Sequence, residues 1–395
     1  MTLDYPDIRV ALGHHWLTGM RGGEKVLAAM AARFPDAPIL TLLAKRDSFA
    51  GELAGRRLVT TLMNRFQRLG NIHQLALPWL PALFKQLDAR AFDSLICSDA
   101  SFAKAIRTRP DALKLCYCHS PPRYVWDLYD EYIRGNGLLR RWGLRLSASC
   151  LRRADRTAAD TVTAFIANSH CVAGRIRDAY GRGSVVIHPP VDTCFARNDD
   201  PAEDFYLVAG AHVAYKRNDL AVEACNRLRR RLVVIGSGGQ VARLHRIAGP
   251  TIELRGWEPD DVVRDYMRRC RALLFCGEED FGIVPVEVQA AGRPVIAYGV
   301  GGATETVLDG KTGVLFDRQS VDGVVDAITR FEQAADLWPA EQIQRHAQSF
   351  DRSVFDRRFE RFYRWCIEGF RSGGAARVRS AVEQLPTDYF LHEGG

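Results

Sequence analysis

The sequence predicts an α/β protein with two Rossmann-like, doubly wound domains. Short β-branched or apolar runs alternate with longer helical patterns along the whole chain, which favours parallel sheets covered by helices on both faces. The chain has 395 residues, more than one hydrophobic core usually supports. Its composition, 47% hydrophobic and 26% charged, is that of a globular protein. We therefore expect two domains, each with its own core.

The apolar runs place the strands of both sheets. In the first half, strands are predicted at residues 8–12, 37–42, 94–97, 113–117, 164–167 and 185–187. In the second half, they are predicted at residues 205–209, 232–235, 252–254, 272–275 and 295–297. Prolines and acidic residues interrupt every periodic pattern between residues 188 and 204. The domains are therefore predicted to span residues 1–195 and 196–349.

The end of the chain carries a helical pattern. Apolar and aromatic residues recur there on one face: Phe350, Val354, Phe359, Phe362, Cys366 and Phe370. This spacing predicts an amphipathic helix over residues 350–371. Residues 372–395 are expected to form a loosely held tail.

Charge and segment composition narrow the function classes. The net charge of +7 favours acidic partners such as nucleotides, phospholipids or lipid-linked phosphates. Nucleic acid is disfavoured because the chain has no long Lys/Arg tract interleaved with aromatics. No signal-like start or membrane-spanning apolar stretch is found, and the ten cysteines form no paired framework. We expect a cytoplasmic protein with reduced thiols.

The most informative motif follows the predicted strand at residues 272–275. Glu279 is expected in the loop at the carboxyl end of that strand, where open α/β sheets bind ligands. Glu287 is expected in the first turn of the next helix. Carboxylates can accept hydrogen bonds from sugar hydroxyls, and a helix N-terminus attracts a pyrophosphate. This combination predicts a nucleotide-sugar site.

The motif resembles the signature of the retaining glycosyltransferases of group 1, also called family 4, which have the GT-B fold. The matching positions are Glu279, Phe281, Gly282, Glu287, Ala290 or Ala291, Gly292, Pro294, Val295, Ile296 and Ala297. The likeness covers residues 8–370. It implies two Rossmann-like domains facing across a cleft, the first on the acceptor side and the second holding the donor. It also implies that the helix over residues 350–371 returns to the first domain.

The resemblance assigns donor-binding residues in the second domain. Glu279 would contact the hydroxyls of the transferred sugar, and Glu287 the ribose. The segment Asp280, Phe281, Gly282, Ile283 and Val284 would face the sugar and phosphate with its backbone N–H groups. Lys216 matches the family's phosphate-binding lysine, whereas Ala211 occupies the position of its arginine. Arg217 is the substitute considered for that missing charge.

In the first domain, Gly22 and Gly23 match the family's Gly-Gly loop, which faces the donor phosphates. His119 matches the histidine of a His-x-Pro segment that points into the cleft. From the residues alone, His119 fits equally well a histidine bonded to a nearby carbonyl. The resemblance favours the functional interpretation. His119, Lys216 and Glu279 are thus the predicted catalytic residues.

The implied reaction is retaining transfer of a hexose, without a metal or other cofactor. No Asp-x-Asp motif is present, so Lys216, helix dipoles and backbone donors would take the role of a magnesium ion. The likeness is greatest to bacterial polysaccharide mannosyltransferases, which implies GDP-mannose as donor and a lipid-linked saccharide or growing polysaccharide as acceptor. A UDP-hexose donor is the alternative.

Contact with a membrane could accompany this function, and three other functions compete with it. Residues 58–87 and 138–153 are basic and amphipathic enough for peripheral contact with an anionic membrane at the inner face, although ordinary packing on the first sheet is preferred. The run from Gly236 to Gly239 suggests an NAD-dependent oxidoreductase, but Val241 stands where the dinucleotide fingerprint needs a small residue. A GT-B epimerase or a non-catalytic sugar-nucleotide scaffold would share the fold.

Overall fold

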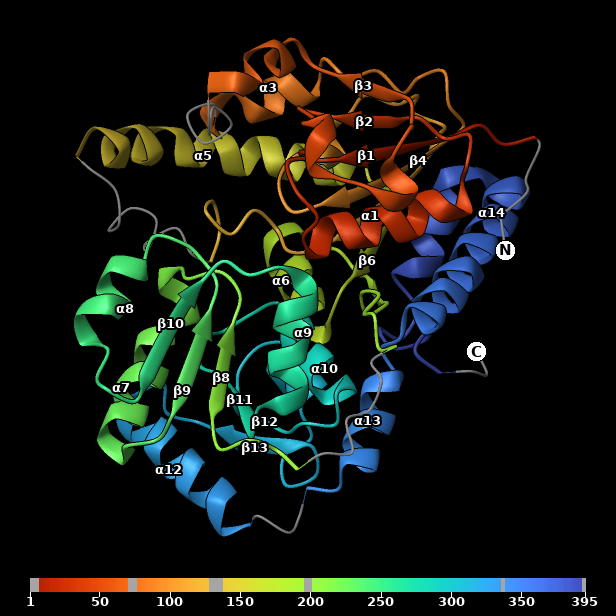
Figure 1. Ribbon diagram of the computed structural model, residues 1–395. Helices are drawn as coiled ribbons and strands as arrows, with labels where there is room; N and C mark the ends of the chain where they lie inside the picture. Colours follow the sequence, from red (N-terminus) through yellow and green to blue (C-terminus); the bar gives the residue numbers. More distant parts are fainter. Residues whose placement is uncertain (1–6, 70–76, 128–137, 195–200, 335–337, 393–395) are drawn as a thin grey trace. The chain divides into compact units, whose positions relative to one another are not determined.

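A computed structural model describes residues 7–69, 77–127, 138–194, 201–334 and 338–392. The chain divides into two compact units (Figure 1). Unit 1 consists of Met1–Pro189 together with Phe355–Gly395, and unit 2 of Pro190–Val354. Each unit is built on a parallel sheet with helices on both faces, which confirms the predicted fold class.

Unit 1 contains a seven-stranded sheet with the order β3-β2-β1-β4-β5-β6-β7. All neighbouring strands pair in parallel. The strands are β1 (Val10–His14), β2 (Ile39–Thr41), β3 (Leu58–Thr60), β4 (Ser94–Asp99), β5 (Leu113–Cys118), β6 (Ala164–Ala167) and β7 (Val185–Val186). Strand order reverses between β1 and β4, because the chain winds first to one edge and then to the other.

Helices bury both faces of this sheet. They are α1 (Gly22–Arg33), α3 (Leu80–Phe84), α5 (Leu138–Asp160), α6 (His170–Tyr180) and α14 (Arg352–Val382). Single-turn or short 3-10 helices complete the unit: η1 (Arg46–Ser48), η2 (Gly51–Leu53), η3 (Leu62–Leu69), η4 (Leu77–Trp79) and η5 (Ala103–Ala105). One core lies under α1 and α14, and the other under α3, α5 and α6.

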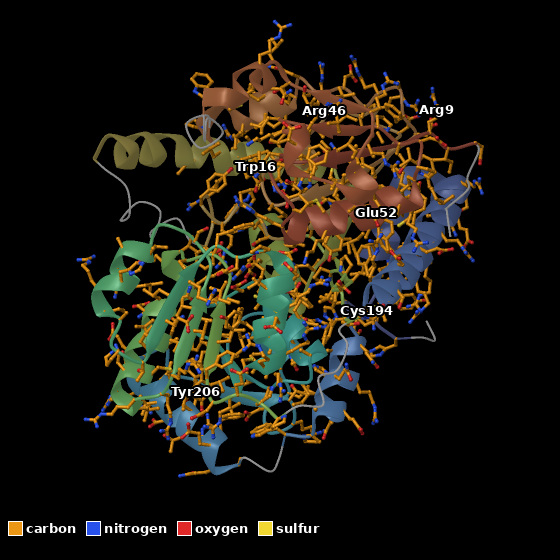
Figure 2. The ribbon with its side chains drawn as sticks, viewed as in Figure 1. Arg9, Trp16, Arg46, Glu52, Cys194 and Tyr206 are labelled. Atoms are coloured by element: carbon orange, nitrogen blue, oxygen red, sulfur yellow. The ribbon has the colours of Figure 1, made fainter. Side chains whose placement is uncertain are left out.

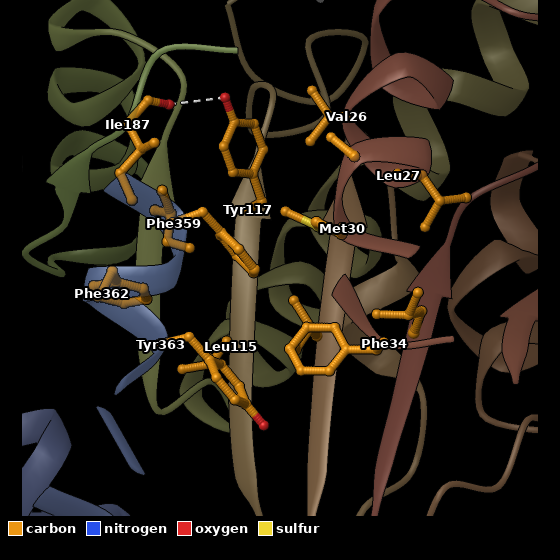
Figure 3. Close-up of a cluster of buried hydrophobic side chains, with 14 of the residues drawn as sticks. Val26, Leu27, Met30, Phe34, Leu115, Tyr117, Ile187, Phe359, Phe362 and Tyr363 are labelled. Atoms are coloured by element: carbon orange, nitrogen blue, oxygen red, sulfur yellow. Dashed lines mark hydrogen bonds between the residues drawn. The ribbon is translucent and has the colours of Figure 1, made fainter. Parts of the chain in front are cut away.

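Figure 3 shows how α14 completes the first of these cores. Phe359 of α14 lies beside Tyr117 of β5 and Tyr363 beside Leu115 of the same strand, and each of these side chains has no measurable exposure. The hydroxyl of Tyr117 donates a 2.8 Å hydrogen bond to the carbonyl of Ile187. Burial of these aromatic rings removes a large apolar area from water, so α14 is an integral part of unit 1.

The C-terminal tail departs from the prediction. Helix α14 continues to Val382, with a kink at Gly373 and Gly374, instead of ending near residue 371. Beyond the kink, Val378, Val382 and Phe390 are each 1% exposed. The expectation of a loosely held tail is therefore wrong for residues 372–392, because three apolar side chains beyond the glycine pair anchor it to the core. Residues 393–395 lie outside the described residues.

Unit 2 contains a six-stranded parallel sheet with the order β10-β9-β8-β11-β12-β13. The strands are β8 (Tyr206–Ala209), β9 (Leu232–Ile235), β10 (Ile252–Gly256), β11 (Ala272–Phe275), β12 (Val295–Tyr298) and β13 (Gly313–Phe316). The helices are η6 (Ala214–Lys216), α7 (Asn218–Leu228), α8 (Val241–Ile247), α9 (Asp260–Arg269), α10 (Ile283–Ala290), α11 (Ala303–Thr306), α12 (Val321–Gln333) and α13 (Ala340–Gln348). Strand order reverses here between β8 and β11.

Two regions carry elements other than those expected. Strands β3 and β13 lie at sheet edges and were not predicted from the sequence, since Leu58–Thr60 is only partly buried and β13 begins with a glycine. The basic segment at residues 58–87 contains β3, η3, η4 and α3, with residues 70–76 outside the described part. Within it, Leu62 is 65% and Trp79 is 69% exposed. Membrane contact through this segment stays a prediction.

Across the described residues, no helix is both long enough and apolar enough to cross a membrane.

Candidate functional site

The switch in strand order of unit 2 brings Lys216 and Glu279 together. Lys216 ends η6, after β8, and Glu279 lies in the loop after β11. The Nζ atom of Lys216 is 2.7 Å from Oε1 of Glu279, and the two side chains are 16% and 21% exposed. Ligands of open α/β sheets bind at such a switch point, at the carboxyl ends of the strands. Two of the predicted catalytic residues therefore form one partly buried ion pair.

Close packing of glycines holds the Glu279 loop in place. A Cβ atom on Gly277 would lie 2.6 Å from Cα of Lys216. On the other side, Gly302 N–H donates a 2.8 Å hydrogen bond to the Glu279 carbonyl, and a Cβ there would lie 2.2 Å from Cα of Phe281. Larger residues at Gly277 or Gly302 would push these backbones apart. The loop position thus depends on glycine at both places.

The predicted phosphate-facing segment ends in the start of α10. Gly282 has φ of +93°, a left-handed conformation that glycine adopts without strain, and α10 begins at Ile283. Phe281 is buried, whereas Asp280, Ile283 and Val284 are partly exposed. Because the helix begins at Ile283, Glu287 lies in its second turn and not in the first turn as predicted. The N-terminal N–H groups of α10 are positioned to attract an anion.

His212, next to the alanine at the arginine position, does not supply the missing charge. Ala211 is exposed, and the adjacent His212 is 3% exposed, with its Nδ1 accepting a 2.9 Å hydrogen bond from Asn218. Burial and the nearby Lys216 lower the pKa of His212, so its imidazole is neutral at pH 7. His212 therefore adds no second positive charge beside Glu279.

Arg217, the residue considered as a substitute, pairs with an aspartate in this structure. Its backbone is left-handed, with φ of +48°, and its Nε donates a 3.3 Å hydrogen bond to Asp219. Arg243 donates a second hydrogen bond of 2.9 Å to the same carboxylate. The predicted substitution by Arg217 stays a hypothesis, and in this structure the guanidinium is engaged with Asp219.

The glycine run after β9 serves loop packing. Gly236 has φ of +141°, and a Cβ on it would lie 1.8 Å from the carbonyl oxygen of Gly210. A Cβ on Gly238 would lie 2.4 Å from the carbonyl oxygen of His212. Close approach to the loop after β8 therefore explains these glycines, without a dinucleotide.

The corresponding switch point of unit 1 gathers histidines. His14 is the last residue of β1, Ser98 lies near the end of β4, and His119 follows β5. His14 Nδ1 donates a 3.0 Å hydrogen bond to the Ser98 carbonyl, and the Ser98 hydroxyl is 2.8 Å from His119 Nε2. The rings of His14 and His15 are tilted by 38° with centroids 4.1 Å apart, and Trp16, labelled in Figure 2, is edge-on to His15 with ring centroids 4.6 Å apart.

Burial keeps these imidazoles neutral. It lowers the pKa of His119 to about 3, with a further lowering by His15 and an opposing effect of Asp99. Burial also lowers the pKa of His14 well below its usual value, with contributions from His15 and His119. Neither side chain carries a charge near pH 7, so both are suited to hydrogen bonding and not to pairing with an anion.

Gly22 and Gly23 begin α1 beside this cluster. A Cβ atom on Gly23 would lie 3.5 Å from His119 Nε2 and 3.6 Å from Cε1 of both His14 and His15. Glu24, 3% exposed, accepts a 3.1 Å hydrogen bond from the N–H of Arg21 and so caps the helix. The structure thus brings Gly23 and His119 together. The contact of this loop with donor phosphates stays a prediction.

Sequence reasoning missed a buried ionic network next to this cluster. Lys104, 1% exposed, lies 2.7 Å from Asp155 and 3.2 Å from Asp99, the last residue of β4. Asp155 also accepts 2.8 Å hydrogen bonds from Trp126 and Tyr180. No local sequence pattern identifies these residues, because a lysine and two aspartates far apart in the sequence are each expected at the surface. Only the fold brings them together.

Among the described residues, no group of three or more His, Cys, Asp or Glu side chains is arranged to hold a metal ion.

Comparison with known proteins identifies the segment that contains the Lys216–Glu279 pair. Residues 203–333 match the family described as glycosyl transferases group 1. The matched range lies within unit 2. Lys216, Glu279, Glu287 and α10 all lie inside the matched range. The resemblance stated from the sequence is therefore supported for residues 203–333, as a similarity to group 1 glycosyltransferases.

Curated relatives align over part of the chain. A GDP-mannose-dependent α-(1-6)-phosphatidylinositol monomannoside mannosyltransferase of Mycolicibacterium smegmatis is 30% identical over 172 residues, covering 39% of this chain and 40% of the relative. A D-inositol 3-phosphate glycosyltransferase of Kribbella flavida is 34% identical over 174 residues, covering 36% and 41%. The chain thus spans less than half the length of these relatives.

Solved structures match nearly the whole chain. Anabaena HepE, crystallised with UDP-glucose, aligns with a TM-score of 0.67 at 17% identity, covering 92% of this chain and 100% of that one. A sucrose-phosphate synthase from Thermosynechococcus elongatus aligns with a TM-score of 0.69 at 16% identity, covering 91% and 99%. At this identity the likeness shows the fold, which is that of GT-B glycosyltransferases.

Proposed function

We propose that this protein is a retaining, metal-independent glycosyltransferase that transfers a hexose to a lipid-linked saccharide or growing polysaccharide. Mannose from GDP-mannose is the donor we favour, and a cytoplasmic setting is the one we expect. The observation that carries the proposal is the Lys216–Glu279 pair at the switch point of a group 1 domain, 2.7 Å apart. A cation and a carboxylate at one sheet edge suit a ligand that combines phosphates with hydroxyls.

Each donor group has a partner in unit 2. Lys216 and the first N–H groups of α10 would bind the pyrophosphate, because both present positive charge. Glu279 would accept hydrogen bonds from hexose hydroxyls, and Glu287 from the ribose. The donor phosphate would compete with Glu279 for the Lys216 ammonium.

The reaction would proceed on one face of the sugar. The bond between C1 and the phosphate oxygen breaks through an oxocarbenium-like state, and a bond forms between C1 and the acceptor oxygen. The acceptor proton passes to the departing phosphate, which leaves as part of the nucleoside diphosphate. Lys216 and the α10 dipole stabilise the charge that develops on this leaving group. In this scheme Glu279 positions the sugar and does not attack it.

The names of the relatives point to two different donors. The Mycolicibacterium relative is described as GDP-mannose-dependent, and the matched structure of HepE is described with UDP-glucose. Both identities are low, so we retain a UDP-hexose as the alternative donor. A thermal-shift panel can identify which nucleobase the protein binds.

A thermal-shift panel tests the donor. GDP, UDP, ADP and their sugars are added in the presence of EDTA, because a ligand that binds only the folded protein raises its melting temperature. We expect a selective increase with GDP and GDP-mannose. An increase with UDP compounds alone would mean that the donor is a UDP-hexose and not GDP-mannose. No response to any nucleotide would contradict the proposed donor site.

The missing arginine favours one non-enzymatic candidate, a sugar-nucleotide-binding scaffold. Ala211 is exposed, His212 is neutral, and Arg217 is engaged with Asp219. A scaffold would bind the nucleotide sugar without releasing nucleoside diphosphate. Release of GDP from GDP-mannose by the purified protein would exclude it.

Placing an arginine at position 211, where the family has one, should strengthen donor binding. We expect Ala211→Arg to bind GDP about 10-fold more tightly, since a hydrogen bond to a charged group contributes about 1.5 kcal/mol. Calorimetric titration with GDP measures this change. Ala214→Arg is the matched control, because it adds the same charge at another exposed position of the same loop. Equal gains in both variants would mean that net charge, and not the phosphate position, controls affinity.

A further inference from the structure

Unit 2 contains a cavity at the amino ends of its strands. The cavity has a volume of about 550 Å³. Its walls come from Asp204 before β8, residues 229–231 before β9, and residues 250–253 at the start of β10. These three strands are neighbours in the sheet (Figure 1). A cavity of this size suits a small molecule.

The cavity and the proposed donor site lie at opposite edges of one sheet. Lys216 follows the carboxyl end of β8, and Glu279 follows the carboxyl end of β11. Strand β9 has four residues, so about 13 Å of strand separates the two edges. A ligand in the cavity would therefore leave the donor site accessible.

Several charges around the cavity are balanced by ion pairs. Arg230 donates hydrogen bonds of 2.8 and 2.7 Å to the two carboxylate oxygens of Glu332. Asp204 lies 3.2 Å from Arg271, which is also 3.5 Å from Glu332. Two arginines thus face two carboxylates in this group. These side chains stabilise the wall and offer no excess charge to a ligand.

Two other arginines of the wall keep unused hydrogen-bond donors. The guanidinium of Arg229 is exposed and makes no hydrogen bond or ion pair with any residue that the structure describes. Arg231 is 3.8 Å from Glu253, which is beyond hydrogen-bond range. Glu253 instead accepts a 2.9 Å hydrogen bond from Arg255. Arg229 and Arg231 therefore present guanidinium N–H groups to the cavity region.

The backbone at Arg229 does not explain why an arginine stands there. Arg229 follows the last residue of α7 and has φ of +53°, in the left-handed region. Glycine is favoured at such a helix end because it has no Cβ. The turn alone would be formed more easily by glycine. We therefore looked for the role of this side chain in the cavity that it lines.

One asparagine fixes the two arginine-bearing and threonine-bearing walls to each other. Asn226 of α7 donates a 2.7 Å hydrogen bond to the Ile247 carbonyl and accepts one of 3.0 Å from the N–H of Gly249. The loop before β10 is thereby held against the end of α7. Thr251 of this loop also lines the cavity, and its hydroxyl bonds to no described residue. The cavity is thus formed in advance, with polar donors on two sides.

We propose that this cavity binds a small soluble compound with two linked phosphate groups, held by Arg229 and Arg231. Guanidinium groups match phosphate oxygens in both charge and hydrogen-bond geometry. Two arginines are too few for a nucleic acid or an anionic membrane, which require an extended basic surface. The inference goes beyond the proposed transferase function and does not depend on it.

Calorimetric titration with inorganic pyrophosphate in EDTA tests the site. All proteins carry Lys216→Met, so that the ammonium of the proposed donor site does not contribute. We expect added Arg229→Gly to weaken pyrophosphate binding about 10-fold, as for loss of one hydrogen bond to a charged group. Glycine accepts the left-handed backbone, so the melting temperature without ligand should not fall. Arg231→Gln is the second variant and should weaken binding in the same direction.

The matched control is Arg227→Ala. It removes a positive charge two residues away, from a side chain that bonds to Asp322 and does not line the cavity. This variant should bind pyrophosphate as the Lys216→Met parent does. Equal weakening in Arg227→Ala and Arg229→Gly would mean that net charge alone controls binding, and would overturn the proposal.

Two further outcomes would also overturn it. One is an affinity that neither Arg229→Gly nor Arg231→Gln changes, and the other is a parent protein that does not bind pyrophosphate. Titration of the wild type with GDP and UDP tests the donor site separately. Failure of that titration would count against the transferase function and would leave the cavity proposal standing.

Discussion

Replacing Glu279 with alanine is expected to reduce sugar transfer by about 10²- to 10³-fold, with unit 2 still folded. The variant loses the carboxylate that would hold the hexose hydroxyls, and it releases Lys216 from its 2.7 Å ion pair. The side chain is 21% exposed, and the melting temperature shows how much packing its removal costs. Initial rates of GDP release measure the loss of transfer, and the melting temperature shows whether unit 2 is still folded.

Two controls make this result specific. Glu278→Ala removes the adjacent carboxylate from the same loop and should retain most of the activity. Azide restores activity to glycosidases whose carboxylate nucleophile has been removed, so we expect no rescue of Glu279→Ala if this residue only positions the sugar. Transfer at the wild-type rate by Glu279→Ala would contradict the proposed site, and azide rescue would contradict the mechanism.

The sequence predicted the central strands because they are buried on both faces. Runs such as Leu232–Ile235 are continuously apolar and can be recognised without any tertiary information. Edge strands such as Leu58–Thr60 are half buried and short, so their pattern is indistinct. The tail was misjudged for a related reason: Val378 and Phe390 become core residues only because the kink after Gly373 turns the chain back onto unit 1.

The candidate site was predictable where its residues lie in one stretch. Glu279, Gly282 and Glu287 belong to a single loop and helix, so a motif identifies them. The histidine cluster of unit 1 joins His14 to Ser98, which are 84 residues apart, through the register of β1 and β4. Strand order creates that contact, and no local pattern contains it.

The buried network of unit 1 allows a second large effect to be predicted. Lys104→Met should lower the free energy of unfolding by about 3–5 kcal/mol, because it leaves two aspartates buried without their cation. Lys104 lies 2.7 Å from Asp155 and 3.2 Å from Asp99, and all three side chains are at most 2% exposed. Urea unfolding at neutral pH measures the loss.

The matched control is the neighbouring buried lysine. Lys114 is 2% exposed, and its Nζ donates to neutral oxygens, the Ile106 carbonyl at 2.8 Å and the Thr161 hydroxyl at 2.9 Å. Burial lowers the pKa of Lys114, so its charge is a cost in the folded state. Lys114→Met should therefore destabilise much less than Lys104→Met. Equal losses in the free energy of unfolding would mean that the ion pairs of Lys104 contribute no more than the packing of its side chain.

The pH dependence of the free energy of unfolding should also differ between the wild type and Lys104→Met. In the wild type, burial raises the pKa of Asp99, but Lys104 and the amides of Ser101 and Ala103 hold it below its usual value. Its contribution is therefore present above the unfolded pKa and lost as the pH falls through the folded pKa.

In Lys104→Met the sign reverses. Burial raises the pKa of Asp155 even in the wild type, and removal of the Lys104 charge should raise the pKa of both Asp155 and Asp99, so the penalty at neutral pH increases and is relieved as the carboxyls become protonated in acid. The stability gap between variant and wild type should narrow from pH 7 to pH 5. A constant gap would mean that the aspartates are hydrated in the variant. Because Asp99 follows Ser98 directly in β4, a protein that loses this network should also lose the geometry on which His14 and His119 depend.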